Sequence, residues 1–205
     1  MAAAILKLDR ALDAVFAQCR DVVRAGGVIA YPTDTFYGLG VDPGNREAVR
    51  KIFAIKGRKT DQAILVLLSD RSEVAEWASL VTTSAERLMD RFWPGPLTLV
   101  FPASAHVLPE LTGGGGTIGL RVPGNGLTRD LLRSLGMALT GTSANRSGGR
   151  DLRTADEVIA EVGDHVDLVL DGGDAPGVRP STIVDVTSEP PRIIRKGIIG
   201  ISLPV

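Results

Sequence analysis

The sequence predicts an α/β fold: a single domain in which helices flank a twisted, mixed β-sheet with a central concave cleft. Segments with helical periodicity alternate along the chain with short apolar, β-prone segments. The segments at 97–101 and 182–185 lack a crossover helix to a neighbouring strand, which favours a mixed sheet over a purely parallel one. With 205 residues, 44% of them hydrophobic, and no linker-like stretch, we expect one domain over residues 1–205.

The first elements are a helix and the strand that follows it. Residues 9–25 repeat apolar side chains every three to four positions and end at a glycine pair, which predicts an amphipathic helix. A buried strand is expected at 28–31. Asn45 is a suitable N-cap for a second helix, which we expect to end near Ile55. The unbroken apolar run at 63–68 predicts a strand buried on both faces.

The later elements follow from the same two periodicities. Val74, Trp77 and Leu80 share one face of a predicted helix. Thr154 followed by Glu157 predicts a capping box at the start of the last helix. The remaining elements are expected to be helices at 85–92 and 127–135 and strands at 97–101, 117–122, 138–140, 166–170, 182–185 and 192–195.

The composition argues against several classes of protein. Lys and Arg number 23 and Asp and Glu number 24, so the net charge of −1 provides no overall basic field for nucleic acid or membranes. No apolar run approaches the roughly 20 residues of a membrane span. The single cysteine, Cys19, excludes an internal disulfide and suits a reducing compartment. We therefore expect a cytoplasmic protein without a membrane partner. His106 and His165 lack metal-ligand spacing, so no protein metal site is expected.

Residues 28–40, VIAYPTDTFYGLG, begin as a strand and then become polar. Ligands of α/β proteins bind beyond the carboxyl ends of strands, so four side chains here are candidates to line a pocket: Thr33, Asp34, Thr35 and Tyr37. The alternative is a capping turn, in which the hydroxyls and the carboxylate bond to nearby backbone amides. On this stretch alone, the two interpretations stay open.

Four basic residues stand at or just beyond the ends of predicted elements: Lys56, Arg58, Arg121 and Arg195. There they can converge although they are distant in sequence. Each charge-assisted hydrogen bond to an oxyanion contributes about 1.5 to 3 kcal/mol, and a triphosphate could engage several. Any one of these residues, taken alone, is more commonly a solvated surface charge. The functional interpretation therefore depends on their convergence.

Two further motifs have competing interpretations. Residues 114–119 match G-x-G-x-x-G but precede a strand, whereas phosphate binding needs this motif between a strand and a helix, so we treat the match as chance. The motif GTSAN is similar to a nucleophile elbow without its last glycine, with His165 next to Asp167 as the available base and orienting carboxylate. Alternatively, Ser143 and Asn145 are short donors for phosphate or carboxylate oxygens. A plain turn also stays open.

Seven motifs occur in this order along the chain: YPTDTFYGLG, KGR, FWPGPLTLVF, GLRVP, TSANRSG, STIVD and IIRKG. Together they resemble the YrdC-like family of threonylcarbamoyl-AMP synthases in its single-domain form, over about residues 9–200, which we take as the core of the domain. The resemblance implies an enzyme that forms threonylcarbamoyl-AMP and pyrophosphate from L-threonine, bicarbonate or CO2, and ATP with Mg2+. Other proteins, the tRNA-threonylcarbamoyl transferases, would move the group to A37 of tRNA. A weak direct contact with tRNA stays open.

The same resemblance assigns residues to two substrates and implies that Lys56 and Arg58 are catalytic through charge neutralisation. The residues implied to bind ATP are Lys56, Arg58, Gln62, Thr117, Ser143, Asn145 and Arg195. The residues implied to bind threonine are Thr35, Leu67, Arg121, Gly141 and Ser181. Because the two cations are assigned to ligand binding, Lys56→Ala and Arg58→Ala are expected to leave the melting temperature almost unchanged.

A function of a different class is a non-catalytic regulatory module that binds RNA or a nucleotide in the same basic concavity. Only 4% of the residues are aromatic, which leaves few side chains on which bases could stack. Pyrophosphate release that depends on threonine would discriminate between the two functions.

Overall fold

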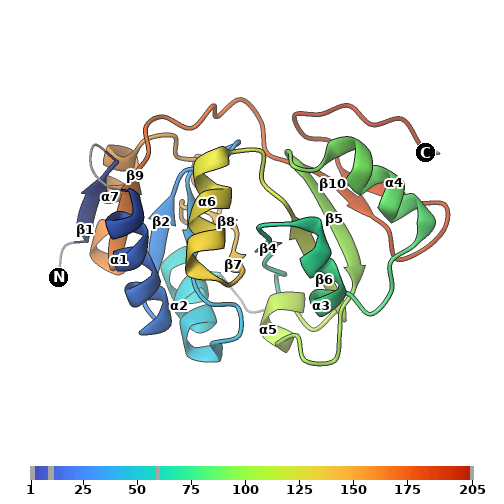
Figure 1. The fold of residues 1–205 in the computed structure, drawn as a ribbon, viewed down its shortest axis with the longest axis horizontal. Helices are drawn as coiled ribbons and strands as arrows, with labels where there is room; N and C mark the ends of the chain where they lie inside the picture. The colour runs from blue at the N-terminus through green and yellow to red at the C-terminus, as the bar shows by residue number, and fades with distance from the viewer. Residues whose placement is uncertain (1–2, 9–11, 59–60, 204–205) are drawn as a thin grey trace.

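The computed structural model describes residues 3–8, 12–58 and 61–203, and the strands among these residues form two mixed sheets (Figure 1). The first sheet has the order β1 (Ala4–Lys7), β9 (Leu168–Asp171), β2 (Ile29–Tyr31), β3 (Gly38–Gly40) and β8 (Thr142–Ser143). The second has the order β11 (Arg192–Arg195), β10 (Thr182–Asp185), β5 (Leu97–Pro102), β6 (Thr117–Arg121), β4 (Val66–Leu67) and β7 (Leu139–Thr140).

The helices flank these sheets. They are α1 (Leu12–Arg24), α2 (Arg46–Lys56), α3 (Val74–Trp77), α4 (Thr83–Phe92), α5 (Pro109–Thr112), α6 (Gly126–Leu135) and α7 (Ala155–Val162), with short 3₁₀ turns at Arg71–Glu73 and Gly163–His165. Helix α2 starts where the sequence predicts, because the Asn45 side chain accepts a hydrogen bond from the backbone of Ala48. It ends at Gly57, whose φ of 61° is left-handed. Residues 9–11 of the first predicted helix lie outside the described part.

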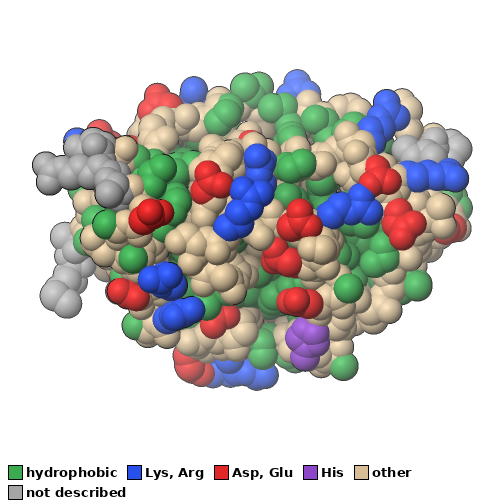
Figure 2. All heavy atoms as spheres, in the orientation of Figure 1, with side chains coloured by type: hydrophobic (Ala, Val, Ile, Leu, Met, Phe, Trp, Pro, Cys, Tyr) green, Lys and Arg blue, Asp and Glu red, His purple; other side chains and the backbone are tan. Residues whose placement is uncertain are grey.

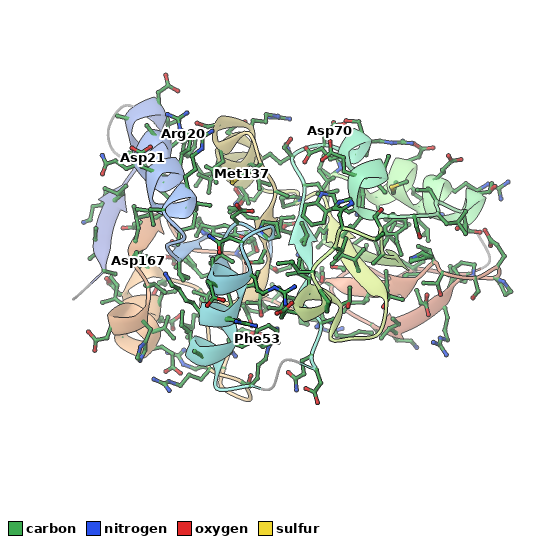
Figure 3. The ribbon with its side chains drawn as sticks, turned by 90° about the horizontal axis from the view of Figure 1, so that it is seen from below. Arg20, Asp21, Phe53, Asp70, Met137 and Asp167 are labelled. Carbon is green, nitrogen blue, oxygen red and sulfur yellow. The ribbon has the colours of Figure 1, made fainter. Side chains whose placement is uncertain are left out.

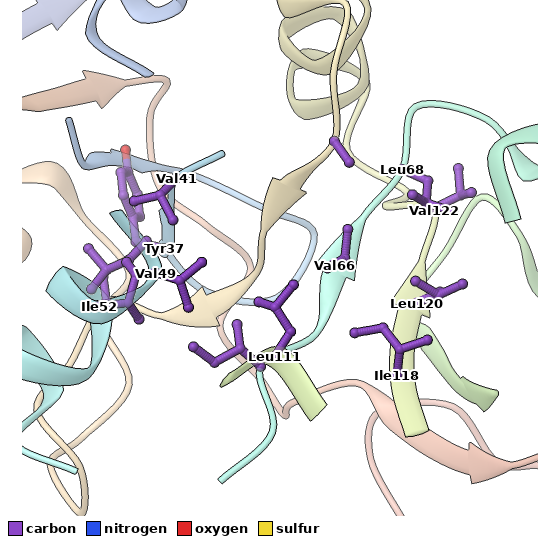
Figure 4. Close-up of a cluster of buried hydrophobic side chains, with 14 of the residues drawn as sticks. Tyr37, Val41, Val49, Ile52, Val66, Leu68, Leu111, Ile118, Leu120 and Val122 are labelled. Carbon is purple, nitrogen blue, oxygen red and sulfur yellow. The ribbon is translucent and has the colours of Figure 1, made fainter. Parts of the chain in front are cut away.

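The α/β class and the mixed strand directions are confirmed, but the strands divide into two sheets where the sequence led us to expect one. Strand β5 pairs antiparallel with β6, and β10 pairs antiparallel with β11, so neither connection needs a crossover helix, while β5 and β10 are parallel to each other. In Figure 1, β1, β2 and β9 lie at the left with the N-terminus, and β5, β10 and α4 lie at the right. The close-up in Figure 4 shows buried side chains of α2 and of the second sheet that belong to one cluster. The two sheets therefore share a core.

Three local predictions are wrong. Of the run 63–68, only Val66–Leu67 is a strand, and Ala63 is exposed rather than buried. Helix α3 ends at Trp77, so Leu80 lies beyond it and is 55% exposed. The Thr154 side chain caps α7 as predicted, but the Glu157 carboxylate accepts from the backbone of Arg153 instead of completing a capping box.

Two predictions drawn from composition can be compared with the structure. Cys19 is fully buried, and burial raises the pKa of its thiol to about 12, as befits a structural cysteine. Within the described ranges, every helix is too short or too polar to span a bilayer.

Candidate functional site

A cleft of about 570 Å³ lies between the two sheets, and every residue assigned above to ATP or threonine lines it. One wall comes from β3, β8 and the end of α2, and the other from β4, β5, β6, β10 and β11. The convergence on which the functional interpretation depends is therefore confirmed. The assignment of individual residues to ATP or to threonine stays a prediction.

The pleat of β6 explains how one strand serves both the core and the cleft. Thr117, Gly119 and Arg121 line the cleft. Ile118 and Leu120 between them are completely buried in the core. Because successive side chains of a strand point to opposite faces, this alternation carries Arg121 into the cleft.

Lys56, the last residue of α2, is buried, with only 4% of its surface exposed. Its Nζ donates to the carbonyl oxygens of Ser143 at 2.7 Å and of Asn145 at 2.8 Å, and lies 3.4 Å from Asn145 Oδ1. Burial and the neighbouring Arg58 lower the pKa of the ammonium to about 8, whereas Asp151 acts in the opposite direction. Lys56 therefore fastens α2 to the loop after β8, which argues against an unchanged melting temperature in Lys56→Ala.

Arg58 differs from Lys56 in that part of its guanidinium has no partner. Its Cζ lies 5.3 Å from the ring centroid of Phe53, a residue of α2 labelled in Figure 3. Nε and Nη2 are buried and have no hydrogen-bond partner among the described residues. A buried donor without a partner costs about 1 to 3 kcal/mol, more when it is charged, so this guanidinium is suited to an anionic ligand.

Arg121 is held from behind by two acceptors. Its Nε donates to the carbonyl of Gly95 at 3.1 Å, and its Nη2 forms an ion pair with Asp34 Oδ1. The residue is 4% exposed, and burial lowers the pKa of its guanidinium while Asp34 opposes the shift. Asp34 does not line the cleft, so its prediction as a pocket residue is wrong. The sequence shows that Asp34 follows a strand, but not whether its side chain lies on the cleft.

The hydroxyls of the PTDT segment satisfy both interpretations that the sequence left open. Thr33 Oγ1 donates to the carbonyl of Phe36 at 2.8 Å and accepts from the backbone of Thr35 at 3.1 Å, which forms the capping turn. Thr33, Thr35 and Tyr37 also line the cleft. The turn therefore presents its own hydroxyls to the site.

Ser181 and Arg195 link the residues assigned to threonine with those assigned to ATP. Arg195 donates to the Ser181 carbonyl through Nε at 3.1 Å and Nη2 at 2.9 Å, and Nη2 lies 3.1 Å from Ser181 Oγ. Ser181 Oγ lies 2.9 Å from the hydroxyl of Thr98, a cleft residue that the sequence analysis missed. Its position on the cleft face of β5, opposite the buried Leu97 and Leu99, could have revealed it.

The TSAN segment is an internally bonded loop rather than a nucleophile elbow. Ser143 Oγ donates to Asn145 Oδ1 at 2.5 Å, and the Asn145 amide donates to a carbonyl further along the loop at 2.6 Å. His165 is exposed and lies 3.4 Å from Arg146, while Asp167 accepts from a backbone amide ahead of β2. The arrangement of a serine hydrolase is therefore absent from these described residues.

Leu67 and Gly141 form an apolar part of the cleft. A Cβ on Gly141 would lie 2.6 Å from Leu65 Cδ1 and 2.8 Å from Leu67 Cγ, so the two leucines occupy the space that a side chain would need. Gln62 lines the cleft and is exposed. It closely follows residues 59–60, which lie outside the described part of the chain.

The charge of the cleft differs from that of the outer surface. Figure 2 shows Lys and Arg interspersed with Asp and Glu on one face of the molecule, in keeping with the net charge of −1. Among the described residues that line the cleft, four are basic and only Asp151 is acidic. Asp151 could not be predicted as a cleft residue from the sequence, because it follows a glycine turn and no predicted strand. The described part of the chain contains no group of three His, Cys, Asp or Glu side chains that could hold a metal by themselves.

The chain is similar in sequence to a known family and its members. The Sua5/YciO/YrdC family model, described as "Telomere recombination", matches residues 21–197. A threonylcarbamoyl-AMP synthase of Thiobacillus denitrificans is 40% identical over 166 residues, which cover 81% of this chain and 88% of that protein.

Two solved structures are similar in fold. Pyrococcus abyssi Sua5 in complex with L-threonine aligns with a TM-score of 0.90 at 31% identity, covering 96% of this chain and 58% of that chain. Escherichia coli YciO aligns with a TM-score of 0.86 at 30% identity, covering 97% of each chain. This chain therefore spans little more than half of the P. abyssi protein but nearly all of YciO.

Proposed function

The chain belongs to the Sua5/YciO/YrdC family, and from this premise we propose that it is an L-threonylcarbamoyladenylate synthase, a nucleotidyltransferase. It forms threonylcarbamoyl-AMP and pyrophosphate from L-threonine, bicarbonate or CO2, and ATP. The T. denitrificans relative carries the name threonylcarbamoyl-AMP synthase, and the Sua5 structure was determined with L-threonine.

The observation that carries the proposal is the guanidinium of Arg58. It has two buried donors without a partner among the described residues, and it lines a cleft that three further basic residues also line. Phosphate oxygens are acceptors that suit such donors, because charge-assisted hydrogen bonds to them are short and strong. Arg58, with Lys56 and Arg195 nearby, is therefore assigned to the triphosphate.

The amino acid occupies the part of the cleft near Arg121. Its carboxylate bonds to the Arg121 guanidinium, and the hydroxyls of Thr35 and Ser181 lie on the same cleft to accept or donate to its polar groups. Leu67 with Gly141 provides apolar contact for the threonine methyl group.

The chemistry requires positioning and charge neutralisation rather than a protein nucleophile. The threonine amine adds to CO2 and loses a proton, which gives a carbamate. A carbamate oxygen attacks the α-phosphorus of ATP, and the bond to the pyrophosphate leaving group breaks. Lys56 and Arg58 stabilise the charge that develops on the phosphates. ATP would enter as its Mg2+ complex, in which phosphate oxygens and the carboxylate of Asp151 would hold the ion and the ion would neutralise phosphate charge.

The product is a donor for a later reaction. In the proposed function, tRNA-threonylcarbamoyl transferases move the threonylcarbamoyl group to A37 of tRNA in the cytoplasm. A direct contact of this chain with tRNA would be weak, because its net charge is −1.

The experiment is pyrophosphate release from ATP by the purified chain, with threonine and bicarbonate added separately and together. We expect release only when both are present, and a product with the mass of threonylcarbamoyl-AMP. Arg58→Met should abolish release, whereas Arg20→Met, a substitution on α1 outside the cleft, should not. Release that is indifferent to threonine would contradict the proposal.

A further inference from the structure

Asp34 lies behind Arg121 and outside the lining of the cleft. One carboxylate oxygen, Oδ1, pairs with Arg121 Nη2. The other, Oδ2, accepts from the backbone of Gly124 at 3.0 Å. The Asp34 side chain is 14% exposed and that of Arg121 only 5%, so solvent screens this pair weakly.

These contacts leave one edge of the guanidinium for a ligand. Arg121 Nε donates to the Gly95 carbonyl, and Nη2 donates one of its hydrogens to Asp34. Nη1 makes no hydrogen bond with the described residues. Gly95 is itself fixed, since its backbone amide donates to Val122 at 2.9 Å. Two acceptors on one side of the guanidinium therefore fix its plane. The opposite side is left for the cleft, which Arg121 lines.

Gly124 is part of the same arrangement. A Cβ at this position would lie 2.9 Å from Asp34 Oδ2 and 3.3 Å from Gly95 Cα. A side chain here would press on the carboxylate that the Gly124 N–H holds, so Asp34 would have to shift. The geometry of the Asp34 carboxylate thus depends on a second residue that does not line the cleft.

We propose that Asp34 is a positioning residue, which orients the Arg121 guanidinium so that its open edge receives the carboxylate of the amino-acid substrate. The proposal rests on the proposed function. Because Asp34 neutralises much of the charge of Arg121, the selectivity for a carboxylate comes mainly from the direction of the donors. Losing the direction of one charge-assisted bond of about 1.5 to 3 kcal/mol corresponds to roughly 10- to 100-fold in affinity.

The test uses two variants that disturb Asp34 in different ways. Asp34→Asn keeps the shape but removes the charge, and Gly124→Ala pushes the carboxylate while leaving both charges in place. We expect each to raise the KM for threonine about 10- to 100-fold, with kcat and the ATP Kd little changed. Calorimetry with L-threoninol, which lacks the carboxylate, should show that the preference for threonine shrinks in both variants.

The matched control is Asp130→Asn, which removes the carboxylate of an exposed pair with Arg133 on α6. It should change neither threonine binding nor the preference over threoninol. Threonine that binds equally well to the wild type, Asp34→Asn and Gly124→Ala would overturn this proposal alone. A parallel loss of kcat, ATP affinity and threonine affinity would also overturn it, because that pattern indicates a merely structural pair. Threonine that fails to bind even to the wild type would overturn the proposed function and this proposal with it.

Discussion

Lys56 and Arg58 are two residues apart, yet the structure gives their cations different surroundings. Lys56 Nζ is bonded to loop carbonyls, whereas two nitrogens of Arg58 have no partner among the described residues. The positions of both at the end of α2 could be predicted from the sequence. The acceptors of Lys56 could not, since they lie 87 and 89 residues away in the chain.

This difference predicts opposite effects on stability. Lys56→Met leaves the carbonyls of Ser143 and Asn145 without their donor and should lower the free energy of unfolding by about 1 to 3 kcal/mol. Arg58→Met removes two buried donors that have no partner among the described residues, and with them their desolvation cost, so it should raise the free energy of unfolding by up to about 1 kcal/mol. Equilibrium unfolding in denaturant measures both. Equal losses in the two variants would contradict the distinction.

The lowered pKa of Lys56 predicts that ATP binding takes up a proton. The free protein loses the Lys56 proton near pH 8, and nearby phosphates favour the charged form, so the pKa is higher in the complex. Between the two pKa values, ATP affinity should fall as pH rises. Calorimetry at pH 8.5, about half a unit above that pKa, in buffers of different ionisation enthalpy measures the uptake. Its absence would place the triphosphate away from Lys56.

The same pKa predicts that the contribution of Lys56 to the free energy of unfolding rises with pH, whereas ATP affinity falls. The unfolded chain keeps the Lys56 proton up to its ordinary pKa of 10.5, above the value of about 8 in the folded protein. Between these values the unfolded state binds more protons, so this group makes folding more favourable as pH rises. Denaturant unfolding from pH 7.5 to 10 should show this upward slope in the wild type but a smaller one in Lys56→Met.

At the scale of elements, periodicity in the apolar run at 63–68 could not distinguish a strand buried on both faces from a strand with one face on the core and the other on a cleft. Val66 and Leu68 face the core, but Leu65 and Leu67 line the cleft. Both faces are apolar, so the sequence indicated a strand enclosed by helices. A cleft wall and a core wall can have the same composition when the substrate also offers an apolar group.

Strands β3 and β8 were missed for a different reason. Strand β3 is GLG, and glycine has low β-propensity. The structure requires it, since a Cβ on Gly40 would lie 2.5 Å from the ring of Tyr31. Glycine is therefore needed in this strand because an aromatic ring from β2 packs on it, a tertiary contact that local propensity does not contain.

The bend between β7 and β8 predicts a selective effect of Gly141→Ala. The added methyl group must displace Leu65 and Leu67, both of which line the cleft beside it. We expect a stability loss of about 1 to 3 kcal/mol and a raised KM for threonine, with the ATP Kd little changed. Gly126→Ala, where a Cβ meets nothing within 4 Å, is the matched control. A larger change in the ATP Kd than in the KM for threonine would contradict the assignment of Gly141 to threonine binding.

For the whole molecule, the sequence predicted the class and most elements but not their division into two sheets. Strand order depends on pairings between distant segments, such as Ala4 with Leu168 and Leu97 with Thr182. No local pattern encodes these partners. The location of the site could nevertheless be predicted, because the polar ends of elements from both sheets meet in one cleft.

A site that spans both sheets predicts that ATP stabilises the molecule as a whole. Arg58 follows α2 beside the first sheet, and Arg195 ends β11 in the second. If both hold one triphosphate, ATP at 100 times its Kd should add about 2.7 kcal/mol to the free energy of unfolding. Arg58→Met and Arg195→Met should each reduce the gain at the same ATP concentration. Hydrogen exchange should show ATP-dependent protection both at the end of α2 and in β10 and β11, since the ligand restrains both walls. Protection confined to one sheet would contradict a shared triphosphate site and would leave Arg195 to the amino acid alone.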